Sequence, residues 1–114
     1  MAVTAYASGS QAATVTTEHF LSSPNVAGTF TLHVDTSVMV AGDVLELRVY
    51  QMILTAGTQR VAYYAQYSGV QVADDMIKIS VPISNELTDT NSLRFSLKQT
   101  FGTGRAFPYK ILAY

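Results

Sequence analysis

Cysteine and tryptophan are absent from the 114-residue chain, and only 13% of its residues are charged, against roughly 25% in an average soluble domain. The lack of cysteine excludes a disulfide scaffold and any zinc site built on thiolates. A net charge of −1 offers no basic excess, which argues against a nucleic-acid partner. No segment approaches the roughly 20 consecutive apolar residues of a membrane-spanning helix.

The first 13 residues, MAVTAYASGSQAA, lack the two features of a secretory signal, which are a basic start and an apolar run of about 7–15 residues. The first Lys or Arg is Arg48, and polar residues interrupt the apolar ones at positions 8–11. We therefore expect a soluble protein made in a cytoplasm. Residues 1–13 are small and polar apart from Tyr6, so we expect them to form a flexible, extended arm, with a disordered terminus as the alternative.

What the sequence does contain, from residue 14 onward, is an alternation of apolar and polar residues with a period of two. This alternation is typical of half-buried β-strands. Clusters of Gly, Pro, Ser and Asn interrupt it at intervals that suit turns. The pattern predicts a single domain over residues 14–114 with about seven antiparallel strands. We expect an all-β sandwich, jelly-roll or immunoglobulin-like, with a small barrel as the alternative. The predicted strands cover residues 14–21, 28–35, 43–54, 59–67, 77–83, 93–98 and 106–114.

The phase of the alternation predicts which side chains form the core. Pro82 cannot donate a hydrogen bond to a neighbouring strand, so its strand is expected to end there or to lie at a sheet edge. The predicted inward residues are Phe30, Leu32, Val34, Leu45, Leu47, Val49, Val61, Tyr63, Ala65, Tyr67, Ile77, Ile79, Val81, Ile83, Leu93, Phe95 and Leu97.

Many of the predicted outward positions are uncharged, which is unusual for a free domain of this size. Tyr and Met enrichment with few charges is typical of the core of a protein–protein interface. We therefore expect part of the surface to face another protein; a neutral, solvated, Thr-rich face is the alternative. Residues outside the core register are Tyr50, Met52, Tyr64, Met76 and Leu112. The candidate protein-contact residues are Tyr6, Tyr50, Tyr64 and Arg105.

No set of residues predicts catalysis. His33 and Asp35 share a strand face roughly 7 Å apart, but a metal site needs at least three ligands, and no third has matching spacing. Asp74 and Asp75 are adjacent, so their side chains point apart on an extended chain. The GTGR segment at residues 102–105 lacks the rest of a nucleotide-binding fingerprint, and its glycines suit a hairpin turn. We expect no enzyme activity, cofactor, metal or small-molecule substrate.

The carboxy-terminal region is the most distinctive part of the sequence. Residues 93–112 read LRFSLKQTFGTGRAFPYKIL, which is a strand, a Gly-Thr-Gly-Arg turn and a closing strand with an aromatic-Pro-aromatic start. This segment resembles small proteins of tailed-bacteriophage structural modules, among them β-sandwich capsid cement or decoration proteins. The remainder of the chain resembles them in length, β pattern and low charge.

The resemblance implies a viral structural protein without catalysis. Such a protein binds the outer face of the assembled capsid shell and ties neighbouring copies of the major capsid protein together, commonly as a dimer or trimer. Its location would be the virion surface, after synthesis in the host cytoplasm. Two alternatives remain at this point. One is a receptor- or carbohydrate-binding sandwich of a phage tail, which needs an exposed aromatic shelf with Tyr50 and Tyr64 as candidates; the other is a ring-forming head–tail completion protein.

Overall fold

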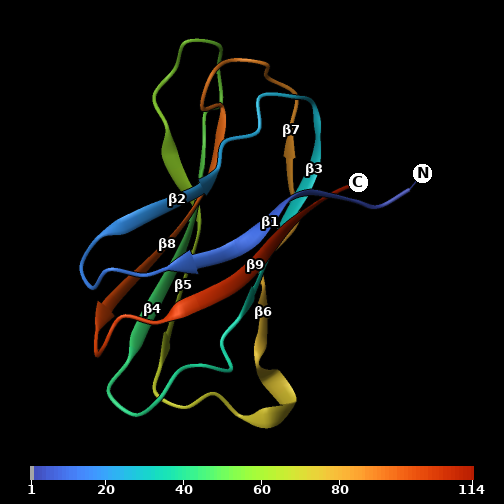
Figure 1. Ribbon diagram of the computed structural model, residues 1–114. Helices are drawn as coiled ribbons and strands as arrows, with labels where there is room; N and C mark the ends of the chain where they lie inside the picture. The colour runs from blue at the N-terminus through green and yellow to red at the C-terminus, as the bar shows by residue number, and fades with distance from the viewer. Residues whose placement is uncertain (1) are drawn as a thin grey trace.

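A computed structural model describes residues 2–114, and nearly all of the regular structure in this part of the chain is β. The expected all-β class is therefore confirmed (Figure 1). The strands are β1 (Thr4–Ala12), β2 (Glu18–Ser22), β3 (Gly28–Asp35), β4 (Val44–Gln51), β5 (Arg60–Ser68), β6 (Ile77–Ile79), β7 (Ile83–Asn85), β8 (Leu93–Phe101) and β9 (Ala106–Ala113), and a short 3₁₀ helix, η1 (Ala73–Asp75), precedes β6.

The strands form two antiparallel sheets that pack face to face, which confirms the predicted sandwich. The β3 sheet has the order β1-β9-β3-β6, with β7 also paired to β3, and the β4 sheet has the order β2-β8-β4-β5. Because β6 and β7 pair with opposite ends of β3, they occupy one strand position between them. Counted in this way, the eight strand positions have the jelly-roll order rather than the immunoglobulin one.

The core between the sheets comes mainly from β3, β4, β8 and β9, as the alternation predicts. Strand β3 has the bounds expected from the sequence, and its inward side chains are at most 1% exposed. The inward residues of β4 and β8 are likewise fully buried, and they close on Phe107 and Ile111 of β9. The three phenylalanines Phe30, Phe95 and Phe107 are the largest of these buried side chains.

The expected inward face of residues 77–81 is wrong, because this segment presents its other face to the core. Ile77, Ile79 and Val81 are 50–55% exposed, whereas Lys78 and Ser80 are buried. Ser80 explains why this face is buried. Its hydroxyl accepts the Leu32 N–H at 2.9 Å and donates to the Val81 carbonyl at 3.0 Å. The hydroxyl thereby extends the pairing with β3 across the gap between β6 and β7. The register returns to the expected face at Ile83, which is buried after the break at Pro82.

A smaller correction applies to β5. The predicted inward residue Val61 is 49% exposed, because the pairing with β4 shifts by one residue between Val49 and Tyr50. Tyr63 pairs with Val49, while Val61 pairs with Tyr50 on the outer side of the shift. Tyr63, Ala65 and Tyr67 keep the expected inward direction and are half-buried.

The expected flexible arm over residues 1–13 is not confirmed for the residues that the structure describes. Thr4–Ala12 form β1, which pairs with β9 along the full length of that strand. A bulge between Ala5 and Ala7 turns the ring of Tyr6 onto Phe30, edge to face at 5.5 Å. Small, polar side chains do not prevent a strand at this position, because its backbone hydrogen bonds to β9 supply the pairing.

The GTGR segment is a turn, as predicted, but it does not close a hairpin. Strands β8 and β9 lie in different sheets, so residues 102–105 cross from one layer of the sandwich to the other. Gly102 adopts a positive φ of 92°, a conformation that glycine tolerates best.

Candidate interaction surfaces

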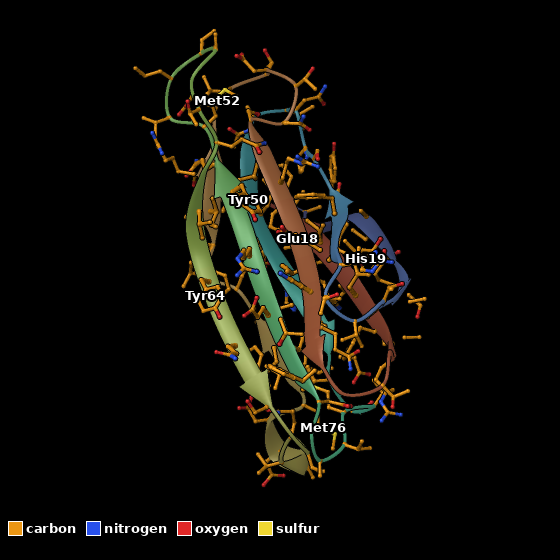
Figure 2. The ribbon with its side chains drawn as sticks, turned by 90° about the vertical axis from the view of Figure 1, so that its left-hand side faces the viewer. Glu18, His19, Tyr50, Met52, Tyr64 and Met76 are labelled. Carbon is orange, nitrogen blue, oxygen red and sulfur yellow. The ribbon has the colours of Figure 1, made fainter. Side chains whose placement is uncertain are left out.

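Tyr50 and Tyr64 lie on the outer face of the β4 sheet, where most of the polar side chains bond to one another (Figure 2). The Tyr50 hydroxyl donates to Glu18 Oε2 at 2.6 Å, and the Ser96 hydroxyl donates to the same oxygen at 2.6 Å. Arg48 pairs with Glu46 at 2.9 Å and lies 4.9 Å from the centre of the Tyr64 ring. This outer face therefore holds much of the chain's scarce charge in internal pairs.

The titration behaviour of Glu18 reflects these bonds. Partial burial opposes ionisation of Glu18, but the hydrogen bonds from Ser96 and Tyr50, with the charges of Arg48 and Lys98, hold its pKa below the ordinary value. Burial and the bond to Glu18 in turn raise the pKa of Tyr50. The Glu18 carboxylate and the Tyr50 hydroxyl thus already have hydrogen-bond partners within the chain.

The two tyrosines do not form an open aromatic shelf. Tyr50 is half-buried, and the ring of Phe20 lies 6.0 Å from it in a tilted arrangement. Tyr64 is 47% exposed, but Arg48 covers one of its ring faces. The sequence placed Tyr50 and Tyr64 on one outer face, and the structure brings them there; it leaves Tyr6 in the β3 sheet and Arg105 in the β8–β9 connection.

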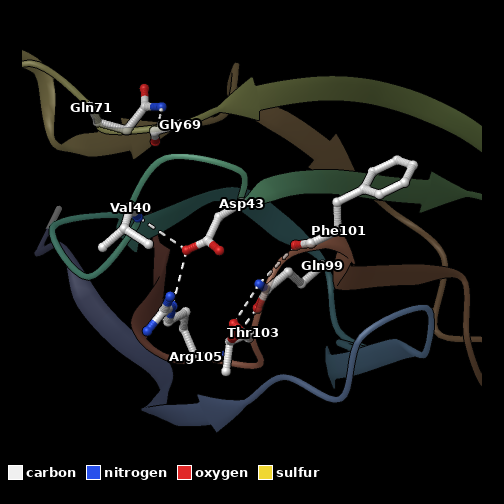
Figure 3. Close-up of polar contacts among 8 residues, drawn as sticks. All are labelled: Val40, Asp43, Gly69, Gln71, Gln99, Phe101, Thr103 and Arg105. Carbon is white, nitrogen blue, oxygen red and sulfur yellow. Dashed lines mark hydrogen bonds and ion pairs between the residues drawn. The ribbon is translucent and has the colours of Figure 1, made fainter.

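Arg105 belongs to a largely buried polar cluster that joins the β3–β4 and β8–β9 connections at one end of the sandwich (Figure 3). Its Nε donates to Asp43 Oδ2 at 3.0 Å, and the Val40 N–H donates to the same oxygen at 3.0 Å. Gln99 organises the other side, because its amide donates to the Phe101 and Thr103 carbonyls and its oxygen accepts the Arg105 N–H.

The environment of Asp43 favours its ionised form although the side chain is only 1% exposed. Burial raises the pKa of this carboxyl, but the bonds from the Val40 N–H and Arg105, with a further contribution from the Thr103 backbone, hold it below the ordinary value. Arg105 is 29% exposed, and its guanidinium forms an ion pair with Asp43. It therefore has a structural role, and as a candidate contact residue it offers little free charge.

The residues expected to form an interface because they fall outside the core register are mostly packed. Met52 is buried, and Tyr50, Met76 and Leu112 are half-buried, which leaves Tyr64 as the exposed member of that set. Exposed apolar side chains are nevertheless abundant, and they come from positions that the sequence assigned to the core or to loops.

Many of them gather on one flank of the sandwich, which we call the β5–β6 flank and define as residues 60–81. The charged residues of this flank are Arg60, Asp74, Asp75 and Lys78, and Lys78 is paired to Asp75. An exposed apolar surface with so few free charges is typical of protein contacts. Its exposed large apolar residues are Val61, Tyr64, Val70, Val72, Ile77, Ile79 and Val81. Sequence reasoning missed half of this surface because an alternating strand does not reveal which of its faces is buried.

Exposed apolar residues also occupy both ends of the molecule. Ile53 and Leu54, which we call the β4–β5 loop tip, belong to the β4–β5 loop at the top of Figure 1 and are 71% and 73% exposed. At the opposite end, Val40 and Phe101 lie beside the Asp43 cluster and are exposed as well. The exposed apolar residues are thus spread along the flank and to both ends of the sandwich rather than confined to one patch, and further ones lie elsewhere: Val3, Tyr6, Phe20, Val26, Val38 and Tyr114.

The edge strand β6 is protected against pairing with another chain. It has three residues, its Lys78 points inward, and Pro82 follows it without an N–H to donate. Lys78 Nζ lies 3.0 Å from Asp75 Oδ2 and 4.7 Å from the centre of the Tyr67 ring. The ammonium of β6 therefore contacts β5 of the other sheet along the open side of the sandwich. Short length, an inward charge and proline are the devices that keep sheet edges from associating.

Lys78→Met is expected to promote association through β6 because it removes the inward charge but keeps the length of the side chain. The free energy of unfolding should change by only about 1 kcal/mol, since Asp75 is exposed and loses little when unpaired. Sedimentation velocity should show larger species than the wild type at equal concentration. Lys110→Met is the control, because it removes the same charge from the exposed face of the central strand β9. Equal association of both variants would contradict a guarding role of Lys78.

A shallow groove of about 410 Å³ lies on the outer face of the β3 sheet. His33 and Asp35 of β3 line it together with Ile77 and Lys110. His33 Nε2 is bonded to the Thr31 hydroxyl at 2.9 Å, and burial together with Lys110 lowers the pKa of His33. His33 and Asp35 share a face, as predicted. No third His, Asp or Glu joins them to form a metal site within residues 2–114.

Two further observations bear on the class of the protein. Across residues 2–114, the structure contains no helix that is long and apolar enough to span a membrane. Comparison with protein-family models, with curated proteins and with solved structures finds no match to the chain.

Proposed function

We propose that this chain is a non-enzymatic structural protein of a tailed bacteriophage, which binds the assembled capsid shell as a cement or decoration protein. Its partner is the major capsid protein, and its place is the outer surface of the virion. The jelly-roll order supports a viral assignment because capsid proteins are among the classes built on this fold, although a fold alone does not assign a function. The resemblance of residues 93–112 to phage structural proteins points the same way.

The observation that carries the proposal is the spread of exposed apolar residues over much of the molecule, including the β5–β6 flank, the β4–β5 loop tip and the end around Phe101. A protein with a single partner needs one apolar patch, whereas a protein embedded in a shell contacts several neighbours. Each contact can be weak, because simultaneous contacts to one shell combine into strong binding. Binding only to the assembled shell then stabilises that shell by linkage.

The shell contact is assigned to the β4–β5 loop tip. Ile53 and Leu54 are the most exposed large apolar residues in the described chain, they are adjacent, and their loop extends from the end of the sandwich. Their burial in a pocket between capsid subunits would remove apolar surface from water with little disturbance of the sandwich. Full burial of such a side chain is worth about 1.5–3 kcal/mol.

The experiment mixes the protein with expanded, undecorated shells assembled from the major capsid protein of the same phage. The protein should co-sediment with the shells and raise the temperature at which they break. The double variant Ile53→Ser with Leu54→Ser should bind at least about tenfold more weakly, because it removes the apolar contacts.

The matched control is Glu86→Ser with Thr88→Ser, two exposed polar residues of the β7–β8 loop at the same end of the molecule. It should bind like the wild type, since polar residues at the rim of a contact contribute little. Absence of wild-type co-sedimentation at every salt concentration would refute the proposed function. Equal weakening by both double variants would refute the assignment of the contact to Ile53 and Leu54.

A further inference from the structure

The connection between β1 and β2 shows a conflict between its sequence and its conformation. Residues 14–17, which we call the hinge, read TVTT, four consecutive β-branched residues that suit a strand. The alternation accordingly predicts a strand over residues 14–21, but β2 begins only at Glu18. The hinge forms a turn instead, closed by a hydrogen bond from the Thr17 N–H to the Thr14 carbonyl at 3.0 Å.

Thr16 has the least favourable backbone conformation in this turn. Its φ is 71°, and it is the only β-branched residue with a positive φ in residues 2–114. The left-handed region is unfavourable for residues with a side chain, and β-branched residues tolerate it least. An extended backbone is the conformation that threonine prefers. Straightening of the hinge would therefore relieve Thr16.

Strand β1 is attached to the sandwich mainly through its backbone. Seven of its nine residues are exposed, and it pairs with β9 at one edge of the β3 sheet. The apolar side chains of β1 that reach the core are Tyr6, whose ring contacts Phe30, and Ala7. All of these contacts depend on the sequence of β1 and not on the copy that supplies it. The edge of β9 therefore accepts β1 of its own chain or of a second copy in the same way.

We propose that two copies of this chain exchange β1, so that residues 4–13 of each copy pair with β9 of the other copy and both hinges become extended. Reciprocal exchange closes into a two-fold dimer, and short hinges under strain favour it. The sandwich has room for a longer β2, because β8 continues to Phe101 beyond Lys98, the last residue of β8 that β2 reaches at this end.

The balance between the two forms depends on concentration. The exchanged dimer keeps every contact between β1 and β9 and replaces two turns with extended backbone, so the conformation of Thr16 favours it. The monomer is favoured at low concentration, because association costs the copies their independent motion. The inference goes beyond the proposed function and does not depend on it, since exchange needs no capsid shell.

Two single-cysteine chains test the exchange directly, because the natural chain has no cysteine. Ser8 of β1 lies opposite Lys110 of β9, and both are exposed. Opposite residues of an antiparallel pair have Cα atoms about 4.5–5.5 Å apart, which a disulfide can span. After joint refolding at high concentration and mild oxidation, a mixture of Ser8→Cys and Lys110→Cys should form covalent heterodimers.

Each cysteine variant refolded and oxidised alone is the control for random cross-linking. Exchange never places Ser8 opposite Ser8 or Lys110 opposite Lys110, so each variant alone should form few covalent dimers. Far-UV circular dichroism verifies that both variants fold. Failure of the mixture to form more covalent dimers than the two controls would overturn the proposal.

A pair of hinge variants tests the role of Thr16, with the solution mass as the readout. Refolded at high concentration, the wild type should contain a species of twice the 12.4 kDa mass of the chain. Thr16→Gly relieves the turn and should raise the dissociation constant of the dimer about tenfold or more. Thr17→Gly is the matched control, because it removes the same side chain from the hinge at a residue without a positive φ, and its effect should be smaller. A wild type that is monomeric at every concentration, or equal dissociation constants for the two glycine variants, would overturn the proposal whatever the shell-binding experiment shows.

Discussion

Gly102→Ala is expected to lower the free energy of unfolding by about 3 kcal/mol or more. Two terms add. The φ of 92° at Gly102 is a conformation that costs a residue with a side chain about 1–2 kcal/mol. The added Cβ would also collide with Oδ1 of Asp43, and overpacking of this kind costs about 1–3 kcal/mol. Asp43 cannot move aside, because Val40 and Arg105 hold its other oxygen.

Gly42→Ala is the matched control for this prediction. Gly42 has the same φ of 92°, but a Cβ there would meet no atom within 4 Å. Gly42→Ala should lower the free energy of unfolding only by the cost of the backbone conformation, about 1–2 kcal/mol. Urea denaturation of both variants measures the difference, which isolates the collision with Asp43. Equal losses at the two glycines would show that the β8–β9 connection is not packed against Asp43 as the structure has it.

Arg105→Met is expected to cost about 3 kcal/mol at neutral pH. The loss is large because it leaves Asp43, which is 1% exposed, as a buried charge without its ion-pair partner. Combining Arg105→Met with Asp43→Asn should restore much of the stability, since the double variant buries no charge. If the double variant were as unstable as Arg105→Met, packing of the arginine rather than charge would explain the loss.

The same pair predicts how stability depends on pH. In the wild type the pKa of Asp43 is held below its ordinary value of 3.8, so its contribution is complete above that value and is lost as the pH falls through the folded-state pKa. In Arg105→Met, burial without the arginine is expected to raise the pKa of Asp43. The variant then gains stability relative to the wild type as acid protonates the carboxyl. Denaturation midpoints measured from neutral to acidic pH should therefore converge at low pH, and a constant difference would contradict the ion-pair explanation.

The strands and the core could be predicted well from local sequence. The alternation over residues 28–35 predicted the bounds of β3 and its buried face. Phe30, Leu32 and Val34 can all be buried at once only if this face of the strand packs against the core. The prediction failed at Ile77 and Ile79, where both faces of a short edge strand carry groups that can be buried. There the bond of Ser80 to Leu32, which is 48 positions away, selected the face together with the pairing of Lys78 and the nearby Asp75.

The candidate surfaces were less predictable than the core. The sequence indicated an apolar, charge-poor exterior, and Tyr64 is exposed as expected, but Met52 and Arg105 are used within the fold. Residue type and spacing say whether a side chain can be exposed; its neighbours in space decide whether it is. The cluster of Asp43, Gln99 and Arg105 joins residues up to 62 positions apart, so no local sequence pattern predicts it.

By itself the sequence determined that this chain folds as β-strands around one apolar core, because period-two alternation and turn residues act over only a few positions. The tertiary structure alone decided the jelly-roll order, the pairing of β1 with β9 and the exposure of the β5–β6 flank. Each of these depends on which strands meet, and strand pairing is set by contacts between residues far apart in the chain.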